Sequence, residues 1–208
     1  DYLMLNDPYL GGTHLPDVTV ISPVYLNGVQ LVGFVVNRAH HANIGCDTPG
    51  SMPISSHLEE EGLVIPPTFL VRNGEVQQNA ARLLGIQEDG LTGDFAAQIG
   101  ANQIGSTRLE QLVKKMGLDV YERRIRQLND LAEKLTLIAI SKLKPGRYRF
   151  LDYLDDDGCG TKNIKLAVHV QITSDSAILD FTESSCMVKG NLNCPEAVVA
   201  AASFYCFR

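Results

Sequence analysis

The sequence predicts an α+β protein: an N-terminal sheet rich in β-hairpins, a central helix pair, and C-terminal antiparallel strands with a terminal helix. Three observations support this class. Residues 1–79 place β-branched and apolar runs between Gly, Pro and Asn, which is typical of strands and loops. Residues 92–143 repeat apolar side chains at helical spacing. Residues 147–208 contain strand patterns and end in an alanine-rich apolar run.

The N-terminal segment contains one clear hairpin. Apolar and β-branched runs at residues 18–25 and 29–37 flank Asn27-Gly28, the dipeptide that a tight hairpin turn prefers. Because a hairpin returns the chain to its starting end, the residues before the first strand and after the second should meet at one end of the sheet. A further apolar segment, residues 63–71, is broken by Pro66-Pro67, and these prolines should keep it at a sheet edge or outside the sheet.

Two helices are predicted in the middle of the chain. The first carries an approximate apolar stripe made of Phe95, Ile99, Ile104, Leu109, Leu112, Val113 and Met116. Gly117 should end this helix and Asp119 can cap the second. The apolar stripe of the second helix is Ile125, Leu128, Leu131, Leu135 and Ile138. Asp94 and Gln98 lie near the start of the first helix, where backbone amides can face a ligand.

The last third returns to strands, at residues 147–151, 164–172 and 177–181. Alternation in the second of these indicates a sheet with one solvated face. The run Asp-Asp-Asp-Gly at residues 155–158 lacks the alternating acidic spacing of an EF-hand loop, so we interpret it as a tight turn between strands. The apolar run at residues 195–207 is predicted to be a buried helix with a proline in its first turn.

Composition argues against several kinds of partner and site. The 208 residues carry a formal net charge of -6, which does not suit nucleic acid or an anionic membrane surface as a partner. The five cysteines are odd in number and show no Cys-x-x-Cys spacing, so a reduced, cytoplasmic location is expected. No apolar run approaches the ~18 residues of a membrane span. A P-loop motif is also absent, so the chain by itself is not expected to bind ATP.

The most distinctive chemistry lies around the predicted hairpin. His14 and Asp17 are three residues apart in a glycine-rich loop before the first strand, and His40 and His41 follow the second strand. Imidazole nitrogen and carboxylate oxygen together suit Zn, Mn or Fe(II), and two His with one Asp leave coordination positions for water or substrate. The residues alone leave a structural interpretation open, in which these side chains cap the loop and hydrogen-bond its backbone.

Eight motifs, taken in order, resemble those of the hydantoinase B/oxoprolinase family. They are NDPYLGGTHLPDVTVISPVY, NRAHHANIG, PGSMP, EEEGLVIPP, GDFAAQIGAN, LDYLDDDG, DFTESS and GNLN. The resemblance spans nearly the whole chain and is most specific in the first third. Subunits of this family are longer on both sides, so residues 1–208 are expected to be a single fragment of a larger hydantoinase B-like subunit. Within it, residues 1–79 would be the metal-site segment, followed by the helical and strand segments.

The resemblance implies a metal-binding catalytic subunit of an ATP-dependent hydrolase of cyclic amides, of the hydantoinase or 5-oxoprolinase type. Carried over by motif, the ligands of its divalent metal (Mn, Zn or Fe) would be His14, Asp17 and His40, with His41 as the alternative to His40. Asp7 and Glu61 are the predicted catalytic carboxylates. Glu59 or Glu60 could replace Glu61 as the general base, and the three together also fit a solvated surface. A hydantoinase A-like partner subunit or domain would use the ATP and activate the small-molecule substrate.

Two alternatives stay open at this point. The same kind of subunit occurs in acetone and acetophenone carboxylases, so the substrate could instead be a ketone. The chain could also be a noncatalytic scaffold that serves mainly to bind its partner. Three departures from the family pattern favour that view: Asn43 replaces a common Asp, and Cys46 and Glu183 replace glycines.

Overall fold

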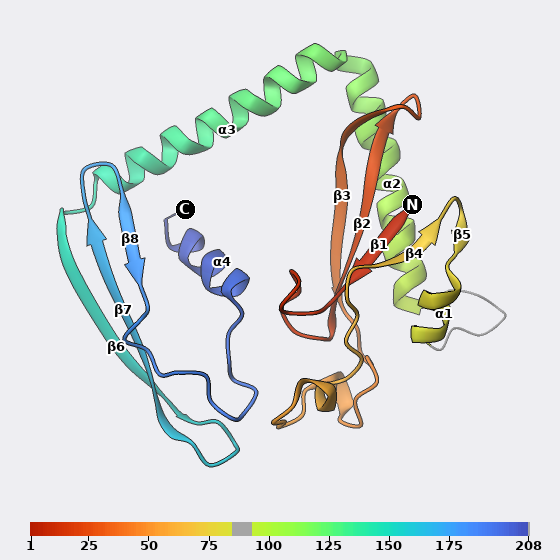
Figure 1. Cartoon of the computed structure of the whole chain (residues 1–208). Helices are drawn as coiled ribbons and strands as arrows, with labels where there is room; N and C mark the ends of the chain where they lie inside the picture. Colours follow the sequence, from red (N-terminus) through yellow and green to blue (C-terminus); the bar gives the residue numbers. More distant parts are fainter. Residues whose placement is uncertain (85–92, 208) are drawn as a thin grey trace. The chain divides into compact units, whose positions relative to one another are not determined.

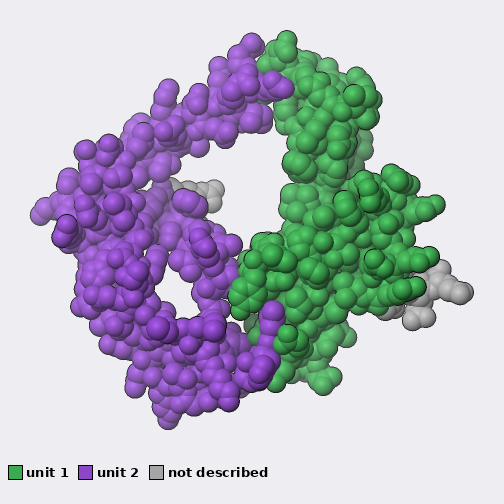
Figure 2. Space-filling model, in the orientation of Figure 1, with its two compact units in different colours: residues 1–53, 59–121 green, residues 54–58, 122–208 purple. Residues whose placement is uncertain are grey.

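The computed structural model describes residues 1–84 and 93–207. The chain forms two compact units, one of residues 1–53 and 59–121 and the other of residues 54–58 and 122–208 (Figure 2). Helices and antiparallel strands both occur, so the predicted α+β class is confirmed. Thr92, the predicted start of the helical segment, and Arg208 lie outside the described residues.

Unit 1 is built on a five-stranded antiparallel sheet (Figure 1). In the order of their pairing, its strands are β3 (Gln30–His40), β2 (Asp17–Leu26), β1 (Tyr2–Leu5), β4 (Thr68–Arg72) and β5 (Glu75–Val76). The predicted hairpin is confirmed, because β2 pairs with β3 and the turn residues Asn27 and Gly28 have φ values of 52° and 73°. A type I′ turn requires these left-handed values. The strand β3 continues beyond its predicted end at Asn37, as far as His40.

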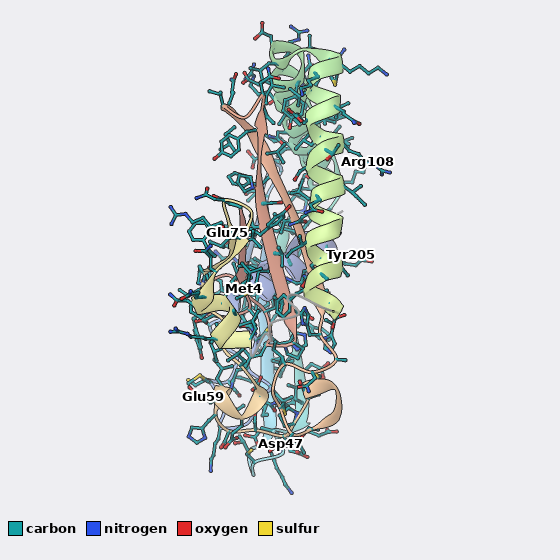
Figure 3. All side chains as sticks on the ribbon, turned by 90° about the vertical axis from the view of Figure 1, so that its right-hand side faces the viewer. Met4, Asp47, Glu59, Glu75, Arg108 and Tyr205 are labelled. Carbon is teal, nitrogen blue, oxygen red and sulfur yellow. The ribbon has the colours of Figure 1, made fainter. Side chains whose placement is uncertain are left out.

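The helix α2 (Gly93–Met116) packs lengthwise on the β2–β3 hairpin (Figure 3). Its predicted apolar stripe is wrong in part, because Ile104 is 57% exposed whereas Gln98 and Asn102 are buried. Both buried amides bind backbone carbonyls of β2: Gln98 Nε2 donates to Val18 at 2.9 Å, and Asn102 Nδ2 donates to Val20 at 3.1 Å. These hydrogen bonds satisfy polar groups that would otherwise be costly to bury.

The core of unit 1 is contributed mainly by the strands and the loops between them. Its largest fully buried apolar side chains are Met4, Leu15, Val18, Val20, Ile65, Leu70 and Val113. The helix α2 approaches the hairpin closely at Gly105. A Cβ added at this residue would lie 2.8 Å from Val35 Cγ1, which is too close for a real side chain. The absence of a side chain at Gly105 therefore sets how closely helix and hairpin approach.

Several short elements have no counterpart in the sequence prediction. These are β1, β5, α1 (Gln78–Leu84) and the 3₁₀ turns η1 (Pro49–Ser51) and η2 (Leu58–Glu61). The expectation for residues 63–71 also needs correction. Pro66-Pro67 precede the strand β4, which lies between β1 and β5 and not at the sheet edge. Proline removes a hydrogen-bond donor only at its own position, so a strand can begin directly after it.

Unit 2 holds the C-terminal strands and most of the second long helix. The three-stranded antiparallel sheet has the order β6 (Gly146–Asp156), β7 (Lys162–Ile172) and β8 (Ala177–Asp180), and all three strands were predicted. The predicted second helix is α3 (Leu118–Ser141), and the terminal helix is α4 (Glu196–Cys206). The predicted burial of the terminal helix is wrong, because none of its residues is buried, and Pro195 caps the helix instead of lying in its first turn. Among the described residues, no helix combines the length and the apolar character that a membrane span requires.

The acidic turn between β6 and β7 is stabilised by hydrogen bonds from backbone N–H groups to the carboxylate of Asp157. Asp157 is 2% exposed, and its carboxylate accepts hydrogen bonds from the N–H groups of Cys159, Thr161 and Gly190 at 2.8 to 3.0 Å. Burial opposes the ionisation of Asp157, but these donors outweigh it and hold its pKa well below the usual range. The predicted turn is confirmed, and Asp157 ties it to the loop at Gly190.

Candidate metal centre

Asn6 anchors the loop that carries His14. The Asn6 side chain is fully buried, and its Nδ2 donates to the carbonyls of Leu15 at 2.8 Å and Leu63 at 2.9 Å. Its Oδ1 accepts a hydrogen bond from the N–H of Ile65 at 2.6 Å. Both donors and the acceptor of the amide are used, so the loop is fastened to the segment that follows η2. Sequence reasoning gave Asn6 no role.

Two consecutive glycines shape the same loop. Gly11 has a φ of 105°, which side-chain-bearing residues rarely adopt. A Cβ on Gly12 would overlap the carbonyl oxygen of Asn6, while the Gly12 N–H donates to the carbonyl of Asp7 at 2.8 Å. The chain can therefore fold back on Asn6 only because neither position carries a side chain.

The pairing of β2 with β3 brings three side chains together. Asp17 begins β2 and is the ladder partner of His40, which ends β3. His14 Nε2 lies 2.9 Å and His40 Nδ1 lies 3.1 Å from Asp17 Oδ1. The two imidazole rings are 5.3 Å apart between centroids. One ligand atom from each of the three residues lies within 4.8 Å of the others, which is close enough for a single ion.

The chemistry of this donor set fits a transition metal. It offers two imidazole nitrogens and one carboxylate oxygen, the combination that Zn, Mn and Fe(II) accept in proteins. The side chains are only partly covered, with 37% of His14, 26% of Asp17 and 48% of His40 exposed. An ion held by these three atoms would therefore keep an accessible side for water or substrate.

His41 lies apart from this cluster. It is 3% exposed, and its Nε2 lies 2.9 Å from Gln98 Oε1 on α2. Its ring also contacts Phe95 edge-on, with the ring centroids 4.6 Å apart. Because Gln98 Nε2 already donates to Val18 and Asn37, the Gln98 oxygen must accept from His41. His41 thus fastens the end of β3 to α2. Gln98 was noted in the sequence for its place near the helix start, but its bond to His41 was not foreseen.

The two predicted catalytic carboxylates lie in turns of unit 1. Asp7 Oδ1 accepts a hydrogen bond from the N–H of Tyr9 at 2.9 Å, which closes a short turn in the loop leading to His14. Glu61 is the last residue of η2. Two residues later, the N–H of Leu63 donates to the carbonyl of Ile44 at 2.7 Å, so the end of η2 runs beside the loop that follows β3.

The three departures from the family pattern each have a local structural role. Asn43 Oδ1 accepts from the N–H of Gly45 at 2.8 Å, and Cys46 Sγ accepts from the N–H of Thr48 at 3.4 Å. In unit 2, Glu183 Oε2 accepts from Arg149 Nη2 at 2.6 Å, and its other oxygen lies 3.1 Å from His169 Nε2. The hydrogen bond from Arg149, aided by His169, lowers the pKa of Glu183. Turn formation and ion pairing account for these residues.

Comparison with known proteins identifies clear relatives. The family model described as hydantoinase B/oxoprolinase matches residues 1–208. A 5-oxoprolinase of Dictyostelium discoideum is 38% identical over 219 residues, covering 100% of this chain and 17% of that protein. A putative B-type subunit of a D-/L-hydantoinase from a Pseudomonas species is 35% identical over 194 residues, covering 89% of this chain and 33% of the relative.

A solved structure shares the fold. The crystal structure of the ATP-dependent caprolactamase from Pseudomonas jessenii aligns with a TM-score of 0.87 and 26% sequence identity. The alignment covers 98% of this chain and 36% of the caprolactamase chain. The present chain thus spans about a third of the length of the hydantoinase subunit and of the caprolactamase chain, and 17% of the length of the Dictyostelium protein.

Proposed function

This chain belongs to the hydantoinase B/oxoprolinase family, and from that premise we propose that it is the metal-binding part of an ATP-dependent hydrolase of cyclic amides. The observation that carries the proposal is the convergence of His14, Asp17 and His40 within 4.8 Å at one end of the β2–β3 hairpin. The substrate class follows the names of its relatives, which are a 5-oxoprolinase, a component of a hydantoinase and a caprolactamase.

The proposed ligand atoms are His14 Nε2, Asp17 Oδ1 and His40 Nδ1. A bound Mn, Zn or Fe(II) would polarise the amide carbonyl and lower the pKa of a coordinated water. The protein contributes a rigid frame, because Asn6 and the two loop glycines fix His14 while the strand ladder fixes Asp17 against His40. His41 is left out of the ligand set, since it does not belong to the group that gathers at Asp17 and its Nε2 lies 2.9 Å from Gln98 Oε1 on α2.

We assign proton transfer to Asp7, in the loop that leads to His14, or to Glu61, the last residue of η2. A general base must reach the water or substrate that it deprotonates, and carboxylates in partly exposed turns can do so. Neither residue belongs to the group of three that gathers at Asp17. Substitution of either residue should therefore lower the rate of catalysis and leave metal binding unchanged.

Activation of the substrate is assigned to a partner. The caprolactamase is described as ATP-dependent, and the Pseudomonas hydantoinase relative is named as one of the subunits of its enzyme. The present sequence has no P-loop motif. We therefore propose that a hydantoinase A-like subunit or domain consumes ATP to activate the cyclic amide, and that the metal centre then assists its opening.

Metal analysis tests this proposal directly. The full-length protein is loaded with Mn²⁺ and Zn²⁺, desalted, and analysed for metal beside a His14→Ala, Asp17→Ala double variant. A His57→Ala, Asp47→Ala double variant serves as the control, because it removes the same residue types outside the cluster. We expect about one metal per chain in the parent and the control, and none in the site variant. Negligible metal in all three would favour the scaffold alternative.

Substrate identity needs a second assay with the partner present. Turnover of hydantoin, 5-oxoproline or a lactam with ATP is the expected result. Turnover of a ketone with ATP and bicarbonate, and none of cyclic amides, would transfer the proposal to the ketone carboxylase alternative.

A further inference from the structure

Arg38 lies on the same face of β3 as His40, two residues earlier, because side chains alternate along a strand. The ladder pairs Arg38 with Thr19, just as it pairs His40 with Asp17. Arg38 Nε donates to Thr19 Oγ1 at 2.8 Å, which fixes the guanidinium beside the predicted metal ligands. The motif contained Arg38, but no role for it followed from the sequence.

The same guanidinium reaches the loop that carries His14. Nη1 of Arg38 donates to Thr13 Oγ1 at 3.4 Å, and Nη2 donates to the carbonyl of Gly11 at 3.3 Å. Thr13 Oγ1 in turn lies 3.4 Å from Asp17 Oδ2. Because a guanidinium can only donate, the Thr13 hydroxyl accepts from Arg38 and is free to donate its single proton to Asp17.

This chain of hydrogen bonds distinguishes the two oxygens of Asp17. Oδ2 receives the Thr13 hydroxyl, whereas Oδ1 faces both imidazoles, at 2.9 Å from His14 and 3.1 Å from His40. A carboxylate held in this way presents one defined oxygen to an ion. In metal sites, hydrogen bonds of this kind from outside the ligand set orient the ligands and commonly alter metal affinity by about 10–100-fold.

We propose that Arg38 and Thr13 are positioning residues for the metal centre: Arg38 orients the Thr13 hydroxyl, and Thr13 fixes Asp17 with Oδ1 turned toward His14 and His40. The inference rests on the proposed metal-binding function and extends it to two residues that do not touch the ion. It also requires both residues to act through the same hydrogen-bonded chain.

The charge of Arg38 makes the proposal sharply testable. A positive charge near a cation site repels the ion, so removing Arg38 should strengthen metal binding if the charge alone matters. A positioning residue has the opposite effect, because its loss frees Asp17 to rotate. The sign of the change in Mn²⁺ affinity therefore separates the two roles.

The experiment titrates Mn²⁺ into the full-length protein and follows free Mn²⁺ by electron paramagnetic resonance. Thr13→Val removes the hydroxyl and keeps the shape, and Thr13→Ser keeps the hydroxyl. Arg38→Gln removes the positive charge. Arg38→Lys keeps the charge but lacks the guanidinium group that donates to both Thr13 and Gly11. Arg126→Gln is the matched control, since Arg126 is an exposed arginine on α3 that only approaches Glu122 at 3.9 Å. Thermal unfolding without metal checks that each variant folds.

We expect Thr13→Val, Arg38→Gln and Arg38→Lys each to raise the Kd for Mn²⁺ by about tenfold or more, the lower end of the range for such partners. Thr13→Ser and Arg126→Gln should bind as the parent does. The double variant Thr13→Val, Arg38→Gln should bind no more weakly than either single variant, because residues in one chain of hydrogen bonds are not additive.

Unchanged or tighter binding by Arg38→Gln would overturn the positioning role, as would additive losses in the double variant. If Arg38→Gln fails to fold, the comparison of Thr13→Val with Thr13→Ser decides the matter. A parent protein that binds no Mn²⁺ would refute the proposed function and this inference together. Binding by the parent with no loss in the variants would refute only the inference.

Discussion

His40 and His41 are adjacent in the chain, but their side chains lie on opposite faces of the β2–β3 hairpin. His40 Nδ1 lies 3.1 Å from Asp17 Oδ1, in the cluster that we propose as a metal centre. His41 Nε2 lies 2.9 Å from Gln98 Oε1, on the helix that covers the other face. The cause is the alternation of side chains along an extended chain. A histidine pair at the end of a strand therefore supplies one residue for each face.

Substitution of the two histidines should affect different properties: metal affinity for His40 and stability for His41. His40→Ala removes one of the three proposed ligands, so we expect the Kd for Mn²⁺ to rise by more than the about 10–100-fold typical of outer partners. His41→Ala leaves the buried Gln98 oxygen without a donor, so it should cost about 1–3 kcal/mol of unfolding free energy. Mn²⁺ titration and urea unfolding of both variants provide the measurements. Loss of metal from His41→Ala alone, at unchanged stability, would contradict the assignment.

Two glycines of α2 offer a matched pair of substitutions. Gly100→Ala places its methyl group where, apart from the helix's own backbone, no atom of the described residues lies within 4 Å, so higher helix propensity should stabilise the protein by about 1 kcal/mol. Gly105→Ala places the same group 2.8 Å from Val35, and crowding of this kind typically costs about 1–3 kcal/mol. Urea unfolding of both variants measures the difference. Equal effects would show that α2 does not pack closely on the hairpin.

Asp157 should make the stability of the protein depend on pH in acid. Its folded-state pKa is lowered by the N–H groups that it accepts from, relative to about 3.9 in an unfolded chain. The stabilisation is therefore present above about pH 4 and is lost as the pH falls below that value. We expect the parent to lose more stability between about pH 4 and 2 than Asp157→Asn, which cannot ionise. Thermal unfolding across this range is the measurement, and identical pH profiles would contradict the prediction.

The proposed catalytic carboxylates can be tested without disturbing their turns. Asp7→Asn keeps the oxygen that accepts from Tyr9, and Glu61→Gln keeps the length of the side chain at the end of η2. In the assembled enzyme, loss of the general base should lower kcat by about 10²–10⁴-fold. Mn²⁺ affinity should not change, because neither residue belongs to the ligand cluster. If both variants retain full kcat, the base lies elsewhere.

The sequence alone determined the strongest local features. Asn27-Gly28 encodes a tight turn, so the hairpin and the meeting of its two flanking loops followed directly. Gly117 and Pro195 likewise marked where helices break and begin. These signals are readable because the backbone conformation depends on the residue itself. The family was recognisable for a related reason, since its loop motifs are unusual in composition.

Tertiary structure decided what depends on distant partners. The sequence could not predict which of His40 and His41 lies beside Asp17, because this depends on how far β3 extends and on which face α2 covers. Nor could it predict that Gln98 and Asn102 would face the hairpin while Ile104 remains exposed. An amide is buried where strand carbonyls and other side chains satisfy it, and those groups lie about 60 to 80 residues away in the sequence. Such pairings become visible only when the chain has folded.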